Sequence, residues 1–360
     1  TAGCARSRFL LTMASNPPAS SPAIVRVTVH DVARAAGVSI GTVSRVVNGA
    51  PTVKAEARER VNRAIAELGW SPSVAAQAMR GVSTRMVGFI FSDIRNPLYA
   101  AMVKGAEDVF TQNGYLLVVA SSDGDPEREM ALIDLFSRRK AEGLLFTVEQ
   151  ESHAGVRKSL AAARIPTVLL ERELSPAVAA VGADHYSGTR QAVEYLLGLG
   201  HRRIALLSGG RNNRVGRDRL RGVMDAHRAA GVTLDESLLR VESFSSDYAF
   251  RQTQLLLSLP QPPTALIAAG MHLLSGVLPA VRMKGLRIPQ DLSLIASNDS
   301  PLAQLATPSI SVIRYDAYAL GREAALLLLH KLKAGEDAQE VRVEVPTELL
   351  IRESCAAPSN

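Results

Sequence analysis

The stretch that most constrains this chain is residues 27–48, whose pattern predicts two short helices joined by a tight turn. Thr28 can cap the first helix, Gly37 can supply the left-handed backbone that a sharp turn needs, and Ser39 can cap the second helix. The apolar residues at helical spacing are Val29, Val32, Ala33 and Ala36 in the first helix, and Val43, Val46 and Val47 in the second. Such a pair is either ordinary core packing or a helix-turn-helix whose second helix enters the major groove of DNA.

The residues that follow favour the DNA-binding interpretation. Residues 54–68 predict a third helix. Its apolar stripe comprises Val61, Ala64, Ile65 and Leu68. Residues 69–80 then contain a helical stretch that starts at a proline and is too short to be stable alone. We therefore expect this stretch to need a partner or DNA.

Basic residues are concentrated in the same part of the chain. The formal net charge is +6 at pH 7, and residues 1–85 hold 11 Lys and Arg against 4 Asp and Glu, while the remainder holds 30 against 31. The basic excess falls where contacts to phosphate are expected, and such contacts depend on salt. Any single one of these cations also fits a solvated helix face. The candidates are Arg26, Arg34, Arg45, Lys54, Arg58, Arg60, Arg63 and Arg80.

Residues 27–80 resemble the DNA-binding headpiece of the lactose-repressor/galactose-repressor (LacI/GalR) family of bacterial transcription regulators. The resemblance is carried by the stretches VTVHDVARAAGVS, TVSRVVNG, ERVNRAIAELGWSPS and AQAMR. It implies that residues 73–79 form a hinge helix, which folds when two protomers sit on an operator. Met79 stands where the family usually has a leucine, the wedge inserted into the central base step from the minor groove. Gln77 stands where many members carry Arg.

The resemblance also implies DNA contacts for individual positions. The family reads bases with the first two positions and the sixth of the recognition helix, here Ile40, Gly41 and Arg45. Arg can bind guanine O6 and N7 together and Ile can pack on a thymine methyl, whereas Gly offers no side chain. The expected base-reading residues are Ile40, Gly41, Thr42, Ser44 and Arg45. The expected phosphate and minor-groove contacts are Thr28, Ser39, Asn48, Gln77, Met79 and Arg80.

The second block, residues 86–354, alternates apolar strand-like runs with helical stretches, which predicts an α/β fold with parallel sheets. The expected strands are 87–91, 115–120, 143–146, 167–170, 204–207, 265–268 and 292–296. The expected helices are 98–111, 128–138, 189–199, 220–230 and 250–259. A binding cleft is expected at the carboxyl ends of the strands.

This block is also similar to the LacI/GalR family, through DIRNPLY, LGHRRIA, RLRG, IPQDLSLI, SPLA and PTELLIRES. The similarity implies a two-lobed fold of the periplasmic-binding-protein type, with a small effector bound between the lobes. The effector-binding residues that it implies are Asn96, Tyr99, Arg172, Asp184, Arg219, Met271 and Asn298.

Two of these positions depart from the family pattern. Met271 follows Gly270 where the family usually has Asn-Asp, and Asn298 stands where it usually has an aspartate. The loss of two acids leaves Arg172 and Arg219 less balanced by negative charge, which favours an anionic effector such as a sugar acid, another carboxylate or a phosphorylated metabolite. The expected partner is therefore a sugar or an organic anion. The alternative is that Arg172 pairs with a neighbouring carboxylate, such as Glu171 or Glu149, and that the pocket has drifted.

Other classes of protein fit the sequence less well. No phosphate-binding loop or His-Glu-x-x-His pair occurs and the 7 His are dispersed, so we expect no enzyme, cofactor or metal site. Cys4 and Cys355 lie near opposite ends, which fits a reducing cytoplasm. Residues 1–12 precede Met13, which we expect to be the natural start, and their apolar run is too brief for a membrane span. No leucine heptad follows Ser354, so a homodimer is expected rather than a tetramer.

The sequence therefore predicts a helical helix-turn-helix headpiece with a hinge helix, followed by a two-lobed α/β domain. The expected boundaries are 1–25 for a disordered or artefactual tail, 26–72 for the headpiece, 73–85 for the hinge and linker, 86–354 for the effector-binding and dimerisation domain, and 355–360 for a C-terminal tail.

The expected function is a repressor that binds a pseudo-palindromic operator as a cytoplasmic, nucleoid-associated homodimer under control of a small effector. The alternatives are a solute-binding protein of a transport system, or a constitutive DNA binder with a degenerate pocket. Whether the effector releases or promotes DNA binding is left open.

Overall fold

The computed structural model describes residues 27–70, 83–175, 178–334 and 341–359. The chain divides into two compact units at residues 82 and 83, and each unit is described by itself. The predicted hinge helix, with Gln77, Met79 and Arg80, lies outside the described residues, as do residues 1–26.

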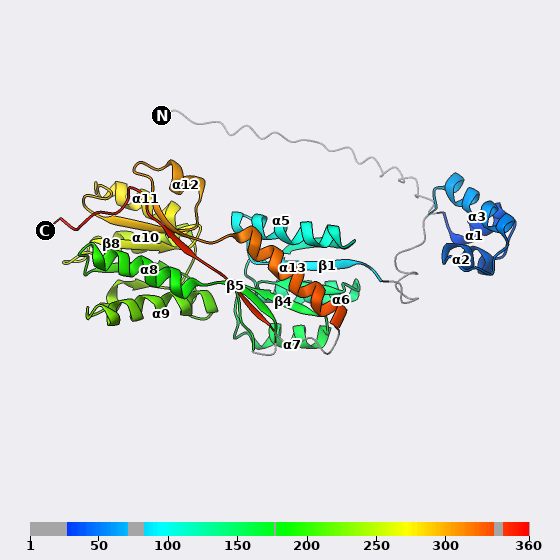
Figure 1. Cartoon of the computed structure of the whole chain (residues 1–360), viewed down its shortest axis with the longest axis horizontal. Coiled ribbons are helices and arrows are strands. Elements are labelled where there is room, and N and C mark those ends of the chain that lie inside the picture. The colour runs from blue at the N-terminus through cyan, green and yellow to red at the C-terminus, as the bar shows by residue number, and fades with distance from the viewer. Residues whose placement is uncertain (1–26, 71–82, 176–177, 335–340, 360) are drawn as a thin grey trace, which may run out of the picture. The chain divides into compact units, whose positions relative to one another are not determined.

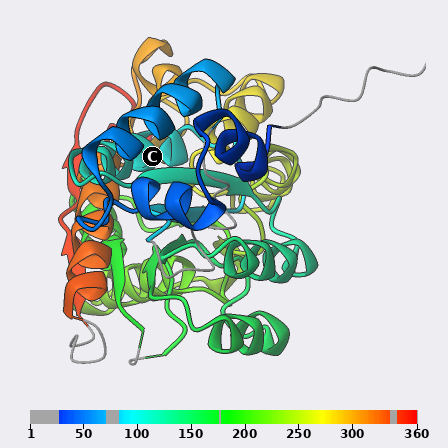
Figure 2. The same cartoon turned by 90° about the vertical axis from the view of Figure 1, so that its right-hand side faces the viewer.

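The first unit is helical, with α1 (Val29–Ala36), α2 (Ile40–Val47) and α3 (Ala55–Leu68) drawn in blue in Figures 1 and 2. Val32, Val43 and Val61 are fully buried where the three helices meet. The predicted helix pair and third helix are thus confirmed. The sequence produces this unit locally, because apolar residues at helical spacing give each short helix one face to bury.

The ends of these helices are fixed by single side chains. The backbone N–H and the hydroxyl of Thr28 both donate to Asp31 Oδ2, at 2.9 and 2.7 Å. Gly37 ends α1 in the left-handed conformation, with φ of 62°. The hydroxyl of Ser39 accepts the Thr42 N–H at 3.2 Å, which begins α2. The predicted turn and the Ser39 cap are therefore confirmed.

The second unit consists of two α/β lobes, and the first is built on a parallel sheet with the strand order β11-β5-β4-β3-β1-β2. The strands are β1 (Met86–Phe91), β2 (Leu116–Ser121), β3 (Gly143–Phe146), β4 (Thr167–Leu170), β5 (Ala180–Ala183) and β11 (Arg342–Val345). Helices α5 (Pro97–Gln112) and α13 (Ala317–Ala334) cover one face, and α6 (Pro126–Arg138) and α7 (Ala154–Ala163) cover the other (Figure 1).

The second lobe has a sheet of the order β12-β10-β9-β8-β6-β7, in which β12 runs antiparallel to β10. Its strands are β6 (Ile204–Ser208), β7 (Leu239–Arg240), β8 (Ala265–Ala269), β9 (Ser293–Ser297), β10 (Ser311–Arg314) and β12 (Glu348–Leu350). Helices α8 (His185–Gly198) and α9 (Arg214–Ala229) pack on one face. Helices α10 (Ser246–Leu256) and α11 (Leu273–Met283) pack on the other, and the short α12 (Pro301–Leu305) follows β9.

Within the described residues, the chain crosses between the lobes from β5 to α8, from β10 to α13 and from β11 to β12. Two of these crossovers are tied together, because the Thr347 hydroxyl donates to the carbonyl oxygen of Asp184 at 2.9 Å. Side chains near the crossovers therefore lie between the lobes.

The seven strands expected from the sequence are present, each with ends displaced by no more than one residue. Helices α8 and α9 begin earlier than expected, at His185 and Arg214, because their first turns are polar and are capped by Asp184 and Asn213. No described helix is both long enough and apolar enough to cross a membrane.

Candidate functional site

The outer face of α2 presents most of the expected base-reading residues. Ile40 is 42% exposed, and Gly41 and Arg45 are exposed, whereas Thr42 and Ser44 are half-buried. A Cβ placed on Gly41 would lie 3.8 Å from Arg45 Nη2, so the guanidinium group lies over the bare glycine. This face therefore carries one cation and one large apolar side chain that are accessible to a partner.

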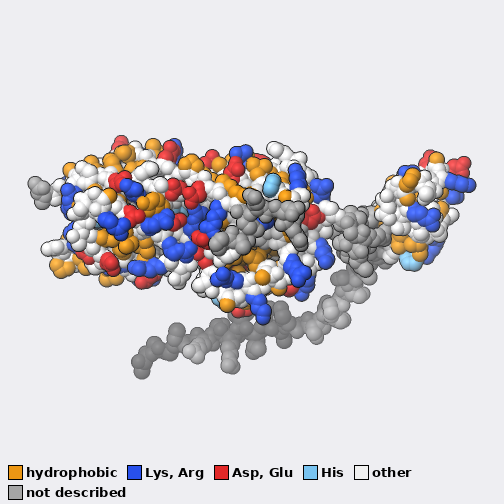
Figure 3. Space-filling view, turned by 60° about the horizontal axis from the view of Figure 1, so that its bottom comes forward, with side chains coloured by type: hydrophobic (Ala, Val, Ile, Leu, Met, Phe, Trp, Pro, Cys, Tyr) orange, Lys and Arg blue, Asp and Glu red, His pale blue; other side chains and the backbone are white. Residues whose placement is uncertain are grey.

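The expected phosphate contacts have mixed surroundings. Arg58 Nη2 donates to the carbonyl oxygen of Ala50 at 2.8 Å, so this side chain helps to hold the loop before α3. Arg34 and Arg63 lie 3.5 Å from acidic neighbours on their own helices, and such exposed pairs are weak. On the face of the second unit drawn in Figure 3, basic and acidic side chains are interspersed.

A cavity of about 630 Å³ lies between the two lobes of the second unit. Of the seven residues expected to bind an effector, six line it: Asn96, Tyr99, Arg172, Arg219, Met271 and Asn298. Asp184 does not line it. Its carboxylate accepts the Ser187 N–H at 2.9 Å and so caps α8. The sequence pattern identified a turn near the cleft, but the cap directs this side chain to its own helix.

The first-lobe wall of the cavity includes the ring of Tyr99 and the guanidinium group of Arg172. Tyr99 stacks on Phe91 with ring centroids 5.0 Å apart, and its hydroxyl lies 2.9 Å from Ser92 Oγ. Arg172, which is 5% exposed, donates to the carbonyl oxygen of Val148 at 2.7 Å. Its Nη2 lies 3.8 Å from Glu149 Oε2. Arg172 is therefore held in place by backbone carbonyls, and although burial opposes it, the negative charges of Glu149, Glu171 and Glu151 raise the pKa of Arg172.

The second-lobe wall contains Arg219, which is 4% exposed. Its guanidinium donates to the carbonyl oxygen of Ala269 and to the hydroxyls of Ser208 and Ser297 at 3.4 and 3.3 Å. Burial lowers the pKa of Arg219 to about 10, so it remains a cation at neutral pH. None of these acceptors is a carboxylate, and the charge is therefore offset mainly through dipoles.

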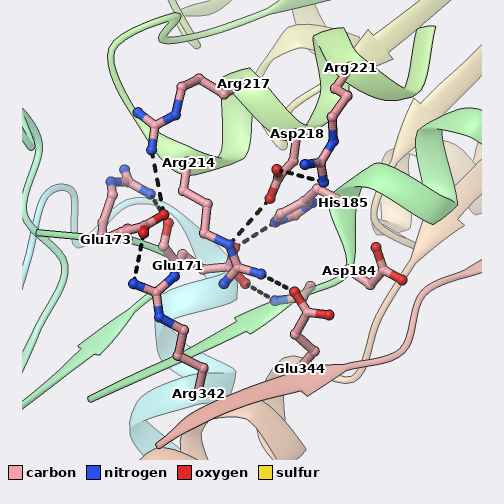
Figure 4. Close-up of polar contacts among 12 residues, drawn as sticks. Glu171, Glu173, Asp184, His185, Arg214, Arg217, Asp218, Arg221, Arg342 and Glu344 are labelled. Atoms are coloured by element: carbon pink, nitrogen blue, oxygen red, sulfur yellow. Dashed lines mark hydrogen bonds and ion pairs between the residues drawn. The ribbon is translucent and has the colours of Figure 1, made fainter. Parts of the chain in front are cut away.

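A buried acid–imidazole pair, which the sequence analysis did not single out, contacts Arg219, and Figure 4 labels both members of the pair. Glu171 Oε2 lies 2.5 Å from His185 Nε2, and His185 Nδ1 lies 3.5 Å from Arg219 Nη2. Burial lowers the pKa of His185, which leaves the ring neutral at pH 7. Burial alone would raise the pKa of Glu171, but His185, the Ala183 amide and Arg214 outweigh it and hold that pKa below its usual value.

This arrangement fixes the roles of the three groups. The neutral His185 ring donates from Nε2 to the ionised Glu171 and accepts at Nδ1 from the cationic Arg219. The imidazole thus bridges the carboxylate of Glu171 and the guanidinium group of Arg219. Each member of the pair is next in sequence to an expected effector-binding residue, since Glu171 precedes Arg172 and His185 follows Asp184. Only the fold brings the two segments together.

A small helical unit with an exposed second helix, followed by two α/β lobes around a polar cavity, defines a DNA-binding regulator with a ligand-binding domain. Residues 28–73 match the family described as bacterial regulatory proteins, lacI family, and residues 193–355 match the periplasmic binding protein-like domain. The chain belongs to the LacI family of bacterial transcription regulators.

Relatives and solved structures agree with this assignment. The HTH-type transcriptional regulator DegA of Bacillus subtilis (strain 168) is 30% identical over 334 residues, which cover 92% of this chain and 98% of DegA. The structure of a transcriptional regulator CelR–cellobiose complex is 31% identical, with a TM-score of 0.70, and covers 91% of this chain and 100% of CelR. The lac repressor dimer bound to operator and the anti-inducer ONPF is 28% identical, with a TM-score of 0.75, covering 92% and 100%.

Proposed function

We propose that this protein is a repressor that binds a pseudo-palindromic operator as a homodimer and that a small molecule in the interlobe cavity controls its operator affinity. The observation that carries the proposal is the presence in one chain of an exposed recognition helix and a polar cavity of about 630 Å³ between two lobes. Such a regulator acts in the cytoplasm, on the nucleoid.

Base reading is assigned to the outer face of α2. Arg45 reaches guanine in the major groove, Ile40 packs on a thymine methyl, and Gly41 lets the backbone approach closely. Thr42 and Ser44 supply further hydroxyl contacts. Thr28, Ser39 and Asn48 lie near the helix ends and contact phosphate, while Gln77, Met79 and Arg80 serve the minor groove.

Exposed apolar side chains support a homodimer. Leu255 on α10 and Met283 on α11 are 58% and 70% exposed, and Leu305 on α12 is 83% exposed. In the first lobe, the edge strand β2 carries Leu116, which is 65% exposed. Soluble monomers seldom leave so many large apolar groups in water on neighbouring elements, and a second copy related by two-fold symmetry would cover them.

For the effector we propose an anionic small molecule, such as a sugar acid, that binds Arg172 and Arg219 in a cavity whose lining also includes the carboxylates of Glu149 and Glu171. Arg219 donates to neutral acceptors, and Arg172 stands 3.8 Å from its acidic neighbour, so each cation can accept an anionic ligand group. Asn96, Tyr99, Met271 and Asn298 also line the cavity. Titration calorimetry with neutral sugars and with sugar acids tests this assignment, and tight binding of a neutral sugar alone refutes it.

The first experiment is selection of genomic DNA fragments by purified protein at two salt concentrations. We expect one enriched palindrome with a pyrimidine–purine centre, lost in Arg45→Ala and Met79→Ala. Arg60→Ala, at an exposed candidate phosphate contact on α3, is the comparison: it should weaken binding to every sequence but keep the motif. Salt-sensitive binding without an enriched motif would leave only electrostatic affinity and refute the specific repressor.

Control by an effector is tested separately by thermal shift. A ligand that binds only the native state stabilises it, and the stabilisation grows with the logarithm of the ratio of ligand concentration to Kd. The ligand changes operator affinity only if it binds the DNA-binding conformation and the alternative conformation with different affinities. Stabilisation by a sugar acid, together with an altered operator affinity, supports the proposal. No shift with any metabolite pool would instead favour a constitutive DNA binder.

A further inference from the structure

Glu151 belongs to the first lobe, between β3 and α7, but its carboxylate contacts the second lobe. It is 6% exposed. Its Oε1 accepts the backbone N–H of Glu173 from its own lobe and that of Arg214 from α9, each at 2.9 Å. Its Oε2 lies 2.9 Å from Arg217 Nη1. One buried carboxylate therefore joins the two lobes through a backbone amide and a guanidinium group.

The contact with Arg214 completes the start of α9. Arg214 is the first residue of this helix, and its N–H has no acceptor within the helix. The capping side chain of Asn213 serves a different amide, that of Gly216, at 3.0 Å. The missing acceptor is thus supplied by Glu151 from the opposite lobe, where its negative charge also suits the positive end of the helix.

Two further ion pairs between the lobes accompany this contact (Figure 4). Arg214 Nη2 lies 2.5 Å from Glu344 Oε1 on β11, and Arg217 Nη2 lies 3.8 Å from Glu173 Oε2. A Cβ added to Gly182 on β5 would stand 2.4 Å from Arg214 Nη1, so the guanidinium packs directly against the first-lobe sheet. The first turn of α9 is therefore held by first-lobe atoms of two strands, β5 and β11, and of the two loops that carry Glu151 and Glu173.

The same elements form opposite walls of the cavity. Asn213 and Val215, at the start of α9, line it from the second lobe, and Glu149 and Gln150 line it from the first. Glu151 follows Gln150 directly, so its bond to Arg214 connects one wall to the other. We propose that Glu151 is a positioning residue that holds the lobes together at the start of α9 and sets the spacing of the effector cavity.

The proposal is tested by the distance between the lobes in full-length protein. Spin labels are placed on cysteines at the exposed positions Lys158 in α7 and Arg228 in α9, after Cys4 and Cys355 are replaced by serine and alanine. Labelled protein is diluted into excess unlabelled protein, so that pulsed electron paramagnetic resonance reads distances within one chain. The chain with the native Glu151 should give a single distance.

Three variants separate the effect of the Glu151 charge from that of its hydrogen bonds and from a general loss of surface charge. Glu151→Gln keeps an acceptor but removes the charge, and Glu151→Ala removes both. Glu107→Gln removes the same charge from an exposed pair with Lys104 inside one lobe, and it is the matched control. In Glu151→Gln we expect a second population in which the distance between the labels is longer than in the native chain, and in Glu151→Ala we expect more of it. In both variants, the ratio of protein with the native distance to protein with the longer distance should fall about tenfold or more. Glu107→Gln should match the native chain.

A charge-dependent role is separated from a merely structural one by combining Glu151→Gln with Arg217→Gln. The free-energy change in lobe spacing caused by the double variant should be smaller than the sum of the changes caused by the two single variants, because either change alone already breaks the pair. An unchanged distance distribution in Glu151→Ala, or an equal change in Glu107→Gln, would overturn the proposal. Operator binding is measured on the same samples, so native protein that fails to bind DNA refutes the proposed function and leaves the result on lobe spacing intact.

Discussion

Replacing Glu129 by glutamine should stabilise the protein relative to the native chain, and this stabilisation should be larger at high pH than at low pH. Glu129, on α6, is fully buried; its Oε1 accepts the Glu149 N–H at 2.8 Å, and among the described residues its Oε2 has no partner. Burial raises the pKa of this carboxyl from 4.5 to about 7. Glutamine keeps the acceptor for Glu149 and removes the charge.

The sign and the size follow from proton linkage. The pKa of Glu129 is higher in the folded than in the unfolded chain, so the folded state binds the extra proton and loses stability as pH rises from 4.5 through about 7. A shift of this size corresponds to roughly 3 kcal/mol, of which about 2–3 kcal/mol develops between pH 5 and pH 8. Glutamine does not titrate. The free energy of unfolding of Glu129→Gln minus that of the native chain should therefore be larger at pH 8 than at pH 5 by this amount.

The assay is urea unfolding followed by circular dichroism at pH 5 and pH 8, for both chains. Glu127→Gln, an exposed change on the same helix, is the control and should shift the two midpoints equally. A difference between the Glu129→Gln and native free energies that is the same at both pH values would refute the reasoning, because the buried carboxyl would then not titrate in this range.

Arg45→Ala should weaken operator binding by about 1–3 kcal/mol and relax specificity at one base pair, measured by fluorescence anisotropy with base-substituted operators. Gly105→Ala should lower the free energy of unfolding by about 1–3 kcal/mol, since the new Cβ would stand 2.1 Å from a carbonyl oxygen of α13. Its control, Gly198→Ala at the end of α8, meets nothing within 4 Å and should not destabilise the protein. His185→Ala should destabilise the second unit by about 3 kcal/mol, because Glu171 would keep a buried charge without its imidazole partner, and Glu171→Gln in the same chain should recover part of the loss.

The headpiece could be predicted well because its information is local. Each of its helices has an apolar stripe, a capping side chain or a glycine within a few residues, and these signals do not depend on the rest of the fold. Helix α13 was missed for the opposite reason. One face of it packs on both α5 and the first sheet, but its exposed face also carries apolar side chains, such as Leu326, so the helical period of the sequence is weak.

The cavity residues show a similar division. The sequence identified six residues that line the cavity, but Glu151 and Glu171 were not predicted as functional. Their roles depend on partners far along the chain: Glu151 contacts Arg214, which is 63 residues later, and Glu171 contacts His185 from the next crossover. No spacing rule within one element relates such pairs. A single sequence therefore reveals the caps and stripes of each element, whereas the side chains that join two lobes become visible only when both lobes are folded.

The position of His185 links the state of the cavity to the geometry of the crossovers. His185 lies where the chain passes from β5 to α8, and its ring meets that of Tyr315, at the crossover from β10 to α13, edge to face with centroids 5.6 Å apart. The same imidazole contacts Arg219 in the cavity wall. A change in lobe orientation that displaces either crossover therefore alters the surroundings of Arg219. By thermodynamic reciprocity, a ligand that binds one arrangement of Arg219 more tightly stabilises the matching orientation of the lobes by the same free energy.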